Sequence, residues 1–435
     1  MAVLRPPGRT TFRRVTSMPG KEQINAQDCV CHECDLLVAV PPLHEGEQAL
    51  CPRCDHVLVQ LAHNPRQGPL VFVLSSLIML ACANLLPFLA INAKGMLNSM
   101  SLFQAAALLF SEDYRVLSVV VFLCMQLLPL SCLLLTGYLY LGLHLKRGAP
   151  PLGAMACRWL FLLLPWSMVE VFLVGVLVSL IKIASLADVS IGYGFWCFCA
   201  FCLMYLKCML YLDRNWLWTK IAGPMPEIPL LHEGAQAREQ GVTLCHGCHG
   251  ILSLETSWCP RCHSRVHARI PHSLEYCVAL LITACILYIP ANLLPIMETE
   301  HLGSTIYSTI LGGVVMLWNM GSYPVAMVIF IASVLVPIAK ILSLFWLCYT
   351  VSRGDIHHKR GRTRLYRLTE FVGRWSMVDV FVVAVLAALI RMGKIMSIYP
   401  GIAAMAFAGV VVVTMIAAML FDPRLIWDRG LVKNG

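Results

Sequence analysis

The stretch Trp166-Ser167-Met168-Val169-Glu170-Val171-Phe172 recurs as Trp375-Ser376-Met377-Val378-Asp379-Val380-Phe381, 209 residues further along the chain. Other landmarks repeat at almost the same offset. Asn84-Leu85-Leu86-Pro87 matches Asn292-Leu293-Leu294-Pro295, Pro129 matches Pro337, Lys182 matches Arg391, and Asp213 matches Asp422. Matches that keep one register over such a distance indicate an internal duplication. The sequence therefore predicts two copies of one unit.

Both copies are strongly apolar. Hydrophobic residues make up 58% of the 435 residues and charged residues 13%, and the mean hydropathy is +0.73. Soluble domains have roughly half apolar and a quarter charged residues, so a soluble enzyme and a disordered chain are both disfavoured. Runs of about 20 apolar residues, which can span a bilayer, occur in eight places: 69–91, 114–145, 159–186, 193–213, 273–296, 322–350, 366–395 and 399–421.

The distribution of Lys and Arg predicts the orientation of these spans. The connections after the second and sixth spans are basic, whereas the connections 92–113 and 297–321 contain between them only Lys94. Short cytoplasmic loops carry the excess of Lys and Arg. We therefore expect both termini and both soluble stretches, 1–68 and 214–272, in the cytoplasm. No apolar segment precedes the first span, so we expect no signal peptide.

Eight of the twenty cysteines form four Cys-x-x-Cys pairs. The pairs fall in the two soluble stretches as Cys31, Cys34, Cys51 and Cys54, and as Cys245, Cys248, Cys259 and Cys262. Two such pairs present four thiolates tetrahedrally, which suits a structural zinc ion, so the sequence predicts two zinc ions, one per ribbon. Thiol redox chemistry and iron are the alternatives. A small ribbon folds only with its metal, which favours a structural role over metal sensing.

These patterns together predict the fold class and the domains. The chain is expected to be an all-α polytopic membrane protein with two tandem four-helix transmembrane domains, a parallel repeat, each preceded by a small cytoplasmic zinc ribbon. The predicted boundaries are 25–64 for the first ribbon, 65–215 for the first transmembrane domain, 240–270 for the second ribbon and 271–428 for the second transmembrane domain.

Two acidic and two basic residues occupy matching positions inside predicted spans of the two halves. Glu170 and Asp379 lie near the bilayer centre, where a carboxyl group costs roughly 2.5–3.5 kcal/mol. They should face the bundle interior and find partners on other helices or a ligand. Lys182 and Arg391 lie near the outer face. Snorkelling to the headgroups explains either cation alone, but their repetition favours a function such as holding a lipid phosphate.

Two asparagines also repeat inside the spans. Asn84 and Asn292 each precede a proline by three residues, and we expect them to satisfy backbone groups that the proline leaves free. Pro87, Pro129, Pro295 and Pro337 are candidates for helix kinks. Lys207 and Lys340 lie near the inner ends of their spans, where snorkelling is the expected behaviour.

Several function classes lack their motifs in this sequence. It contains no Walker A motif for an ATP-driven engine and no catalytic Ser/His/Asp or Glu-rich metal constellation. No basic patch with interleaved aromatic residues suggests nucleic-acid binding. We therefore expect neither an enzyme nor a nucleic-acid-binding protein.

Several motifs resemble those of one family. They are Cys31-His32-Glu33-Cys34-Asp35, Cys51-Pro52-Arg53-Cys54, Asn84-Leu85-Leu86-Pro87, Ser111-Glu112-Asp113-Tyr114, Asn292-Leu293-Leu294-Pro295, Gly321-Ser322-Tyr323-Pro324-Val325-Ala326, Gly373-Arg374-Trp375-Ser376-Met377-Val378-Asp379 and Phe421-Asp422-Pro423-Arg424. Over residues 28–428 the chain resembles the paraquat-inducible protein A family, which includes PqiA-like and LetA-like members, and it is more similar to the PqiA-like ones.

The resemblance implies a location and partners. It implies a multi-pass protein of the Gram-negative inner membrane that acts in lipid trafficking and envelope integrity and carries zinc ribbons. The implied partners are a periplasmic MCE-domain tunnel protein (PqiB/LetB-like), a PqiC-like outer-membrane lipoprotein and membrane lipids. In this family the lysine that matches Lys182 belongs to a polar cluster. LetA-like members add an acid three residues later, where this chain has Ser185.

Three functional hypotheses follow. The first is a lipid transport subunit with Glu170, Lys182, Asp379 and Arg391 along the route and the two acids as candidates for proton coupling. The second is a membrane-bound thiol redox protein of the stress response, which predicts titratable disulfides in the Cys-x-x-Cys pairs. The third is a structural anchor that only seats the MCE partner.

Overall fold

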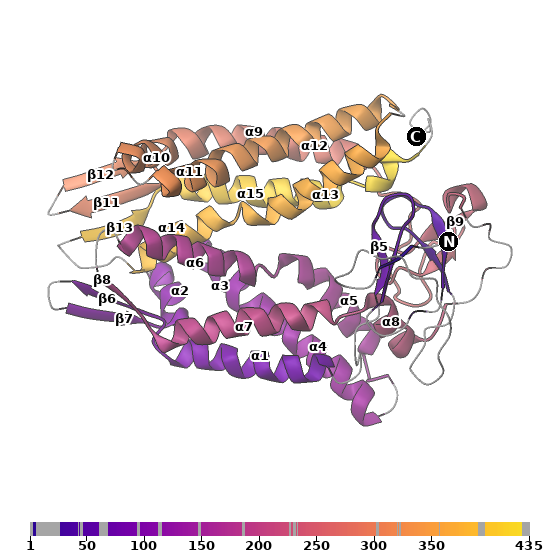
Figure 1. Ribbon diagram of the computed structural model, residues 1–435. Coiled ribbons are helices and arrows are strands. Elements are labelled where there is room, and N and C mark those ends of the chain that lie inside the picture. The colour runs from indigo at the N-terminus through magenta and orange to yellow at the C-terminus, as the bar shows by residue number, and fades with distance from the viewer. Residues whose placement is uncertain are drawn as a thin grey trace.

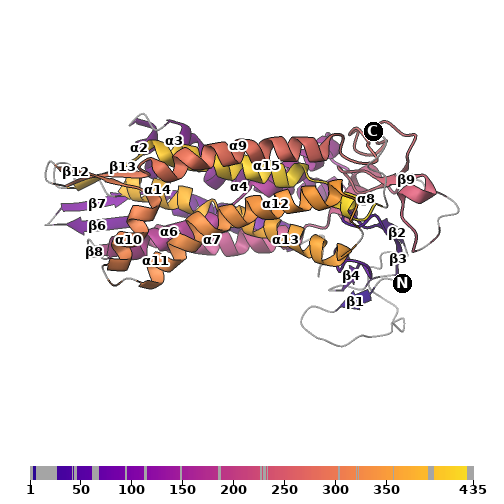
Figure 2. The ribbon, with the colours of Figure 1, turned by 90° about the horizontal axis from the view of Figure 1, so that it is seen from above.

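The fold is described from a computed structural model. The described residues are 3–5, 27–41, 43, 47–60, 68–93, 96–111, 115–146, 149–184, 188–225, 228, 232, 234–301, 304–319, 321, 323–355, 357–389 and 396–428. Figures 1 and 2 show long helices running side by side along one axis, with strands extending from one end and the cysteine-rich ribbons at the other. We call these the outer end and the ribbon end.

The first half of the helical body begins with α1 (Gly68–Leu85). A hairpin of β6 (Leu89–Ala93) and β7 (Met96–Met100) follows it, and then come α2 (Leu102–Ser111), α3 (Arg115–Phe122), a π-helical turn (Leu123–Leu127) and α4 (Leu128–Lys146). The half continues with α5 (Gly153–Leu163), a 3₁₀ turn (Leu164–Trp166), α6 (Val169–Ala184), β8 (Asp188–Ile191), α7 (Tyr193–Leu210) and α8 (Arg214–Ala222).

The second half repeats this order. Its elements are α9 (Ser273–Leu293), β11 (Met297–His301), β12 (Ser304–Ser308), α10 (Ile310–Asn319), α11 (Tyr323–Phe330), a π-helical turn (Ile331–Leu335) and α12 (Val336–Ser352). They continue with α13 (Lys359–Trp375), α14 (Val378–Leu389), β13 (Met396–Pro400), α15 (Ile402–Leu420) and a 3₁₀ turn (Pro423–Ile426). The repeated order confirms the duplication.

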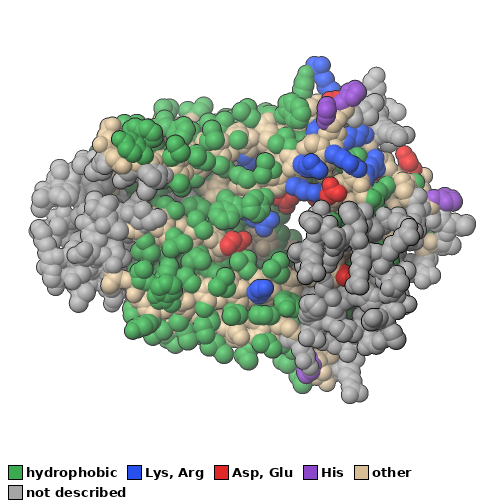
Figure 3. All heavy atoms as spheres, in the orientation of Figure 1, with side chains coloured by type: hydrophobic (Ala, Val, Ile, Leu, Met, Phe, Trp, Pro, Cys, Tyr) green, Lys and Arg blue, Asp and Glu red, His purple; other side chains and the backbone are tan. Residues whose placement is uncertain are grey.

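Seven helices among the described residues are long and apolar enough to span a membrane. They are Gly68–Leu85, Leu123–Leu145, Gly153–Leu180, Tyr193–Leu210, Ser273–Leu293, Ala326–Ser352 and Ile402–Leu420. Hydrophobic side chains cover the visible face of the helical body, and Lys and Arg gather at the ribbon end (Figure 3). A multi-pass membrane protein is the class that fits these features.

The span expected over 159–186 is found as Gly153–Leu180, whereas no candidate span among the described residues corresponds to the one expected over 366–395. Both segments are interrupted at the repeated Trp-Ser-Met motif, where α6 begins at Val169 and α14 begins at Val378. In the first half, Pro165 ends the helical hydrogen bonding and Ser167 is extended (ψ 108°). Both serines are buried, consistent with the rule that irregular backbone at membrane depth is shielded by protein.

Of the four prolines expected to kink helices, Pro87 and Pro295 lie outside the helices, whereas Pro129 and Pro337 lie inside continuous helical stretches. Pro87 and Pro295 follow the ends of α1 and α9, so they help to end these helices. Pro129 and Pro337 lie in the first turns of α4 and α12, directly after the two π-helical turns. A π-helical turn leaves room for a ring that cannot donate a backbone hydrogen bond.

The two halves meet inside the helical body through α6 and α14. Phe172 and Phe381 are equivalent by the repeat, and their ring centroids lie 5.5 Å apart. A Cβ added at Gly175 would lie 3.0 Å from the Cβ of Phe381, so the backbones approach closely. A contact between equivalent residues places them on a pseudo-twofold axis, as at an isologous interface.

The strands at the outer end were not part of the all-α prediction. Two antiparallel sheets have the orders β7-β6-β8 and β12-β11-β13, so each is built within one half. In each sheet the central strand follows the first long helix and pairs with a strand that precedes the last one. The fold is therefore mostly helical with small sheets at its outer end.

Candidate metal centres and the residues between the membrane helices

Each ribbon places its cysteines in tight turns. In ribbon 1 the turns lie between β2 (Gln27–Val30) and β3 (Leu37–Val40) and between β4 (Gln48–Leu50) and β5 (Val57–Gln60); β1 (Val3–Arg5) pairs with β4. In ribbon 2 the first turn lies between β9 (Val242–Leu244) and β10 (Ile251–Ser253). The second is closed by a bridge between Trp258 and Arg265.

All four turns share one backbone geometry. The residue after the second cysteine of each pair has a positive φ and donates its N–H to the carbonyl of the first cysteine, at 2.8–2.9 Å. These residues are Asp35, Asp55, His249 and His263. Asp and His are among the residues enriched in the left-handed region. The turn directs both sulfurs of a pair to the same side.

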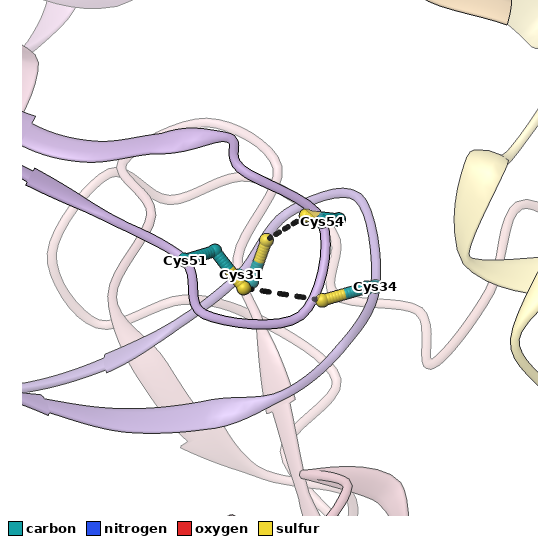
Figure 4. Close-up of side chains that lie close together, drawn as sticks. All are labelled: Cys31, Cys34, Cys51 and Cys54. Atoms are coloured by element: carbon teal, nitrogen blue, oxygen red, sulfur yellow. Dashed lines mark hydrogen bonds between the residues drawn. The ribbon is translucent and has the colours of Figure 1, made fainter. Parts of the chain in front are cut away.

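The eight expected ligands form two buried groups of four. In ribbon 1 the sulfurs of Cys31 and Cys54 lie 3.5 Å apart, as do those of Cys34 and Cys51 (Figure 4). The corresponding distances in ribbon 2 are 3.4 and 3.6 Å. Tetrahedral zinc at about 2.3 Å from each sulfur requires sulfurs about 3.8 Å apart, so the residues fit this metal. None of the eight is in a disulfide.

Arginines surround the sulfurs. Arg367 donates to the carbonyl of Cys54 at 2.7 Å, and Arg53 donates to that of Cys34. Burial lowers the pKa of Arg214 and of Arg261, and the cysteines of ribbon 2 oppose this shift. Four thiolates around a divalent ion carry a net charge of about −2, which these guanidinium groups offset.

Ribbon 1 precedes the first half in sequence but docks on the second half. Arg367 of α13 donates to the carboxylate of Glu33 from Nε and from Nη2. Arg360 donates to the carbonyls of Pro52 and Arg53. Although burial alone would raise the pKa of Glu33, hydrogen bonds from His56 and Arg367 hold it below its usual range. The contact is therefore an ion pair with one partner buried.

A second ion cluster joins ribbon 1 to the C-terminal segment. Arg269 donates to Asp35 Oδ2 at 2.8 Å and to Asp428 Oδ1 at 2.7 Å. The side chain of Arg269 is 10% exposed, and those of Asp35 and Asp428 are 1% and 6% exposed. Burial alone would lower the pKa of Arg269, but the carboxylates of Asp428 and Asp35 raise it above its usual value. This arginine thus neutralises two buried acids from separate segments.

Ribbon 2 makes the reciprocal contact with the first half. Arg261 donates to Thr219 Oγ1 of α8 at 2.9 Å, and Arg214 contacts His249 Nε2 at 2.7 Å. His32 of ribbon 1 stacks on His249, with ring centroids 5.6 Å apart, and burial lowers the pKa of His32 to about 4. The ribbons are therefore crossed over the two halves and touch each other.

The structure describes only part of the predicted intramembrane site. Glu170 lies in the first turn of α6, half-buried, and makes no hydrogen bond or ion pair with a described residue. The positive end of the helix dipole favours a carboxylate there. Lys182 lies on α6 and Asp379 on α14, both with side chains outside the described set, and Arg391 lies outside the described residues. Their mutual contacts remain a prediction.

The two asparagines bond to their own helices. Asn84 Nδ2 donates to the carbonyl of Leu80, and Asn292 Nδ2 donates to that of Tyr288, each four residues earlier. Asn84 also accepts a hydrogen bond from Gln126 in the first π-helical turn at 2.6 Å. The bonds go to carbonyls near the helix ends rather than to those that the prolines leave free.

The expectation that Lys340 snorkels to the membrane surface is wrong, because its side chain is buried. Its side chain is 3% exposed, and its Nζ has no hydrogen-bond partner within the described residues. A Cβ at Gly373 would lie 2.7 Å from this nitrogen, so the glycine makes room for the lysine just before the α13–α14 break. Gly373 lies three residues before Ser376 in the sequence, but only the structure shows that it lies against Lys340.

Comparison with known proteins assigns the family. The family model described as paraquat-inducible protein A matches residues 67–222 and again residues 274–430. The chain belongs to the paraquat-inducible protein A family. Intermembrane transport protein PqiA of Escherichia coli K12 is 45% identical over 93% of this chain and 96% of its own length.

More distant relatives cover almost the whole chain as well. Lipophilic envelope-spanning tunnel protein A of Escherichia coli K12 is 30% identical over 98% of this chain and 97% of its own length. A probable intermembrane transport protein of Haemophilus influenzae is 30% identical over 91% of this chain and 95% of its own. No solved structure matches the chain.

The family assignment coincides with the structural repeat. The two matched ranges correspond to the two helical halves and leave out both ribbons. The family model therefore describes one helical half with its sheet and matches this chain twice.

Proposed function

We propose that this protein is the inner-membrane subunit of an MCE-type intermembrane lipid transport system in a Gram-negative cell. It passes phospholipid-like molecules between the inner membrane and a periplasmic MCE-domain tunnel protein and so supports envelope integrity. The observation that carries the proposal is the 45% identity over 93% of the chain to a protein named for intermembrane transport. The relative named for a lipophilic tunnel across the envelope supports the same class of cargo.

The orientation follows from charge. The ribbon end carries the basic cluster around α13, and basic loops stay in the cytoplasm. The ribbons and both termini then lie in the cytoplasm, and the sheets of the outer end face the periplasm. These sheets are the surface for the MCE tunnel protein, and a PqiC-like lipoprotein in the outer membrane completes the path.

The route lies where the two halves meet. Discontinuous membrane helices at a repeat interface form the substrate and ion sites of many transporters, and α6 and α14 are both preceded by such breaks. Glu170 and Asp379 lie just after these breaks, and Lys340 is buried beside one of them. Intramembrane ionisable groups mark transport pathways by default. We assign proton coupling to the acids and lipid-phosphate binding to Lys182 and Arg391.

The metal assignment is two zinc ions, one per ribbon. Each ion would be held by four cysteine sulfurs and would supply folding energy rather than chemistry. The sulfurs of each group lie within 4.8 Å of one another, which suits one ion bound by all four. A redox pair needs only two cysteines and an accessible thiolate, and all eight sulfurs belong to buried residues.

Lipid transfer in a reconstituted system tests the transport proposal. Purified protein in proteoliposomes with labelled phospholipid is mixed with the soluble MCE partner, and lipid on the partner is measured. Glu170→Gln, Lys182→Ala and Lys340→Met are expected to reduce loading with unchanged partner binding. Lys207→Ala, at an exposed lysine of α7, is the matched control and should transfer normally.

The alternatives predict different results. Normal loading by all three variants would leave the protein as an anchor for the partner and refute the polar route. Alkylation with mass spectrometry, together with metal analysis, addresses the redox alternative. Two zinc ions per chain with eight reduced ribbon thiols exclude that alternative, whereas reversible disulfides within the Cys-x-x-Cys pairs would establish it.

A further inference from the structure

A small cavity lies at the outer end of the second half, beside the end of β12. Its volume is about 50 Å³, and its walls come from the first turns of α10, from α11 with its π-helical turn, and from α14. Figures 1 and 2 show α10 and α11 next to the second outer sheet. Ser308, Gly313 and Ile329 line the cavity and are half-exposed, so it is accessible from the surface of the helical body.

The repeat explains why the second half has this cavity. Ser333 lines it and is the third residue of the second π-helical turn. The third residue of the first π-helical turn is Met125. The side chain of Met125 is 2% exposed and packs in the core of the first half. A buried methionine is thus replaced by a serine, which leaves space beside the turn.

Other lining positions change in the same direction. The pairs with the larger residue in the first half are Phe88 and Ile296, Met100 and Ser308, Ala105 and Gly313, and Leu173 and Val382. Thr309 and Ile329 go the other way, each by one carbon atom relative to Ser101 and Val121. The net loss of side-chain volume lies on one side of the repeat, so the cavity is a feature of the second half.

The helices around the cavity present exposed apolar side chains. Val315 and Met316 of α10 are 57% and 54% exposed, and Met327 and Val328 of α11 are 53% and 54% exposed. Most of α11 belongs to the candidate membrane span Ala326–Ser352. Such side chains contact hydrocarbon in a bilayer, so lipid acyl chains are the molecules that surround this surface.

The size and the hydroxyl groups of the cavity limit what can enter it. About 50 Å³ exceeds the roughly 10–15 Å³ that one water needs and falls far below the roughly 300–1,000 Å³ of a drug-sized site. Ser308, Thr309 and Ser333 contribute hydroxyl groups. Thr309 Oγ1 accepts the backbone N–H of Gly312 at 3.1 Å, and its O–H can still donate. The cavity therefore suits a few carbon atoms beside a hydrogen-bond acceptor, and not a headgroup.

We propose that this cavity holds the first carbons of one acyl chain of a glycerophospholipid from the leaflet at the outer end. The ester carbonyl of that chain accepts from the hydroxyl groups of Ser308 and Thr309. The chain takes the space that Met125 fills in the first half. The site deepens the proposed function and rests on it for its role, which is to hold the cargo beside the outer sheets assigned to the tunnel protein.

Two substitutions that restore the residue of the first half test the site. Ser333→Met and Ser308→Met each fill the cavity with a side chain that the repeat already accommodates, and either one serves if the other fails to fold. Ser333→Ala removes a hydroxyl and keeps the space. Val315→Met, at an exposed position of α10, adds apolar volume outside the cavity and is the matched control. Full-length protein in proteoliposomes is photolabelled with a phospholipid that carries a diazirine near the ester of one acyl chain, and labelled peptides are quantified by mass spectrometry.

The native chain, Ser333→Ala and Val315→Met are expected to be labelled in the peptides that contain residues 308–313 and 329–333. Both filling variants should reduce this labelling about eightfold, because an empty cavity costs about 24 cal/mol per Å³, or about 1.2 kcal/mol for this volume. Equal labelling of the native chain and the filled variants overturns the proposal, as does absence of label from these peptides in the native chain. In that second case, weaker binding of the soluble MCE partner by Ser333→Met would assign the cavity to an apolar side chain of the partner.

Lipid transfer to the partner, measured on the same native proteoliposomes, separates this site from the transport proposal. Labelling without transfer refutes transport and leaves the acyl-chain site in place. Transfer without labelling refutes the acyl-chain site alone.

Discussion

Replacement of Arg269 by Met should release ribbon 1 from the helical body. Arg269 neutralises Asp35 in ribbon 1 and Asp428 in the C-terminal segment at 2.8 and 2.7 Å. Met keeps most of the volume of the side chain and removes all of its charge. The substitution leaves two buried carboxylates, one on each side of the contact, without their shared cation.

The size of the effect follows from burial. Removing one partner of a buried ion pair costs about 3–5 kcal/mol, and Asp35 and Asp428 are only 1% and 6% exposed. Arg238 lies 3.6 Å from Asp428 and offsets part of the loss there. We therefore expect the low end, about 3 kcal/mol, which raises the undocked fraction of ribbon 1 about 100-fold.

The assay is the alkylation rate of the ribbon 1 cysteines, measured by mass spectrometry on purified full-length protein. Arg269→Met should accelerate it about 100-fold, and Asp35→Asn in the same chain should recover most of the difference, because it removes one uncompensated charge. Arg364→Met is the control: the Arg364–Asp55 pair is 72% and 62% exposed, and such pairs contribute about 0–1 kcal/mol. Equal rates for Arg269→Met and Arg364→Met would refute the reasoning.

Three further predictions concern the metal ions, the Asp213 carboxylate, whose Oδ2 has no hydrogen-bond partner among the described residues, and the contact between α6 and α14. Metal analysis should find two zinc ions per chain and one in Cys51→Ser or Cys259→Ser, since each ribbon binds its ion independently; full occupancy in either variant contradicts the assignment. In lipid-free detergent, Asp213→Asn should raise the thermal midpoint at pH 8 but not at pH 4. Burial raises the pKa of Asp213 in the folded state from 3.8 to about 6. The free energy of unfolding of the native protein should therefore fall by about 1–2 kcal/mol as the pH rises from about 4 to 6, after allowance for partial exposure of the group. Gly175→Ala should lower the thermal midpoint, with a loss of about 1–3 kcal/mol in the free energy of unfolding, because the added Cβ would lie 3.0 Å from Phe381. The control Gly313→Ala has open space around the added Cβ and should leave the midpoint unchanged.

The sequence was sufficient for the features that depend on local pattern. Apolar runs located seven of the spans, and the register of Trp166 with Trp375 revealed the duplication. The cysteine spacing identified both groups of four sulfurs, because a Cys-x-x-Cys turn fixes its own geometry. The family resemblance is confirmed by two matches of the family model.

Long-range features could not be predicted from one sequence. Nothing in the spacing of Arg367 or Arg269 indicates that they pair with acids more than 200 residues away. Burial of Lys340 depends on Gly373 of another helix, and a lysine near a helix end otherwise reads as exposed. The outer strands were missed because their segments are short and lie between apolar helices, where hydropathy is the stronger signal.

The arrangement of contacts along the long axis decides how the two halves can move relative to each other. At the ribbon end the two ribbons join the halves: ribbon 1 is held to the second half by the Glu33–Arg367 ion pair, and ribbon 2 is held to the first half by the hydrogen bond from Arg261 to Thr219. At mid-depth they touch through Gly175 and the equivalent phenylalanines. At the outer end each sheet is completed within its own half, so no strand pairing joins the halves among the described residues. Among the described residues, the ion pair that ties a ribbon across to the other half lies at the ribbon end, and the outer end is the face that we assign to the periplasmic partner.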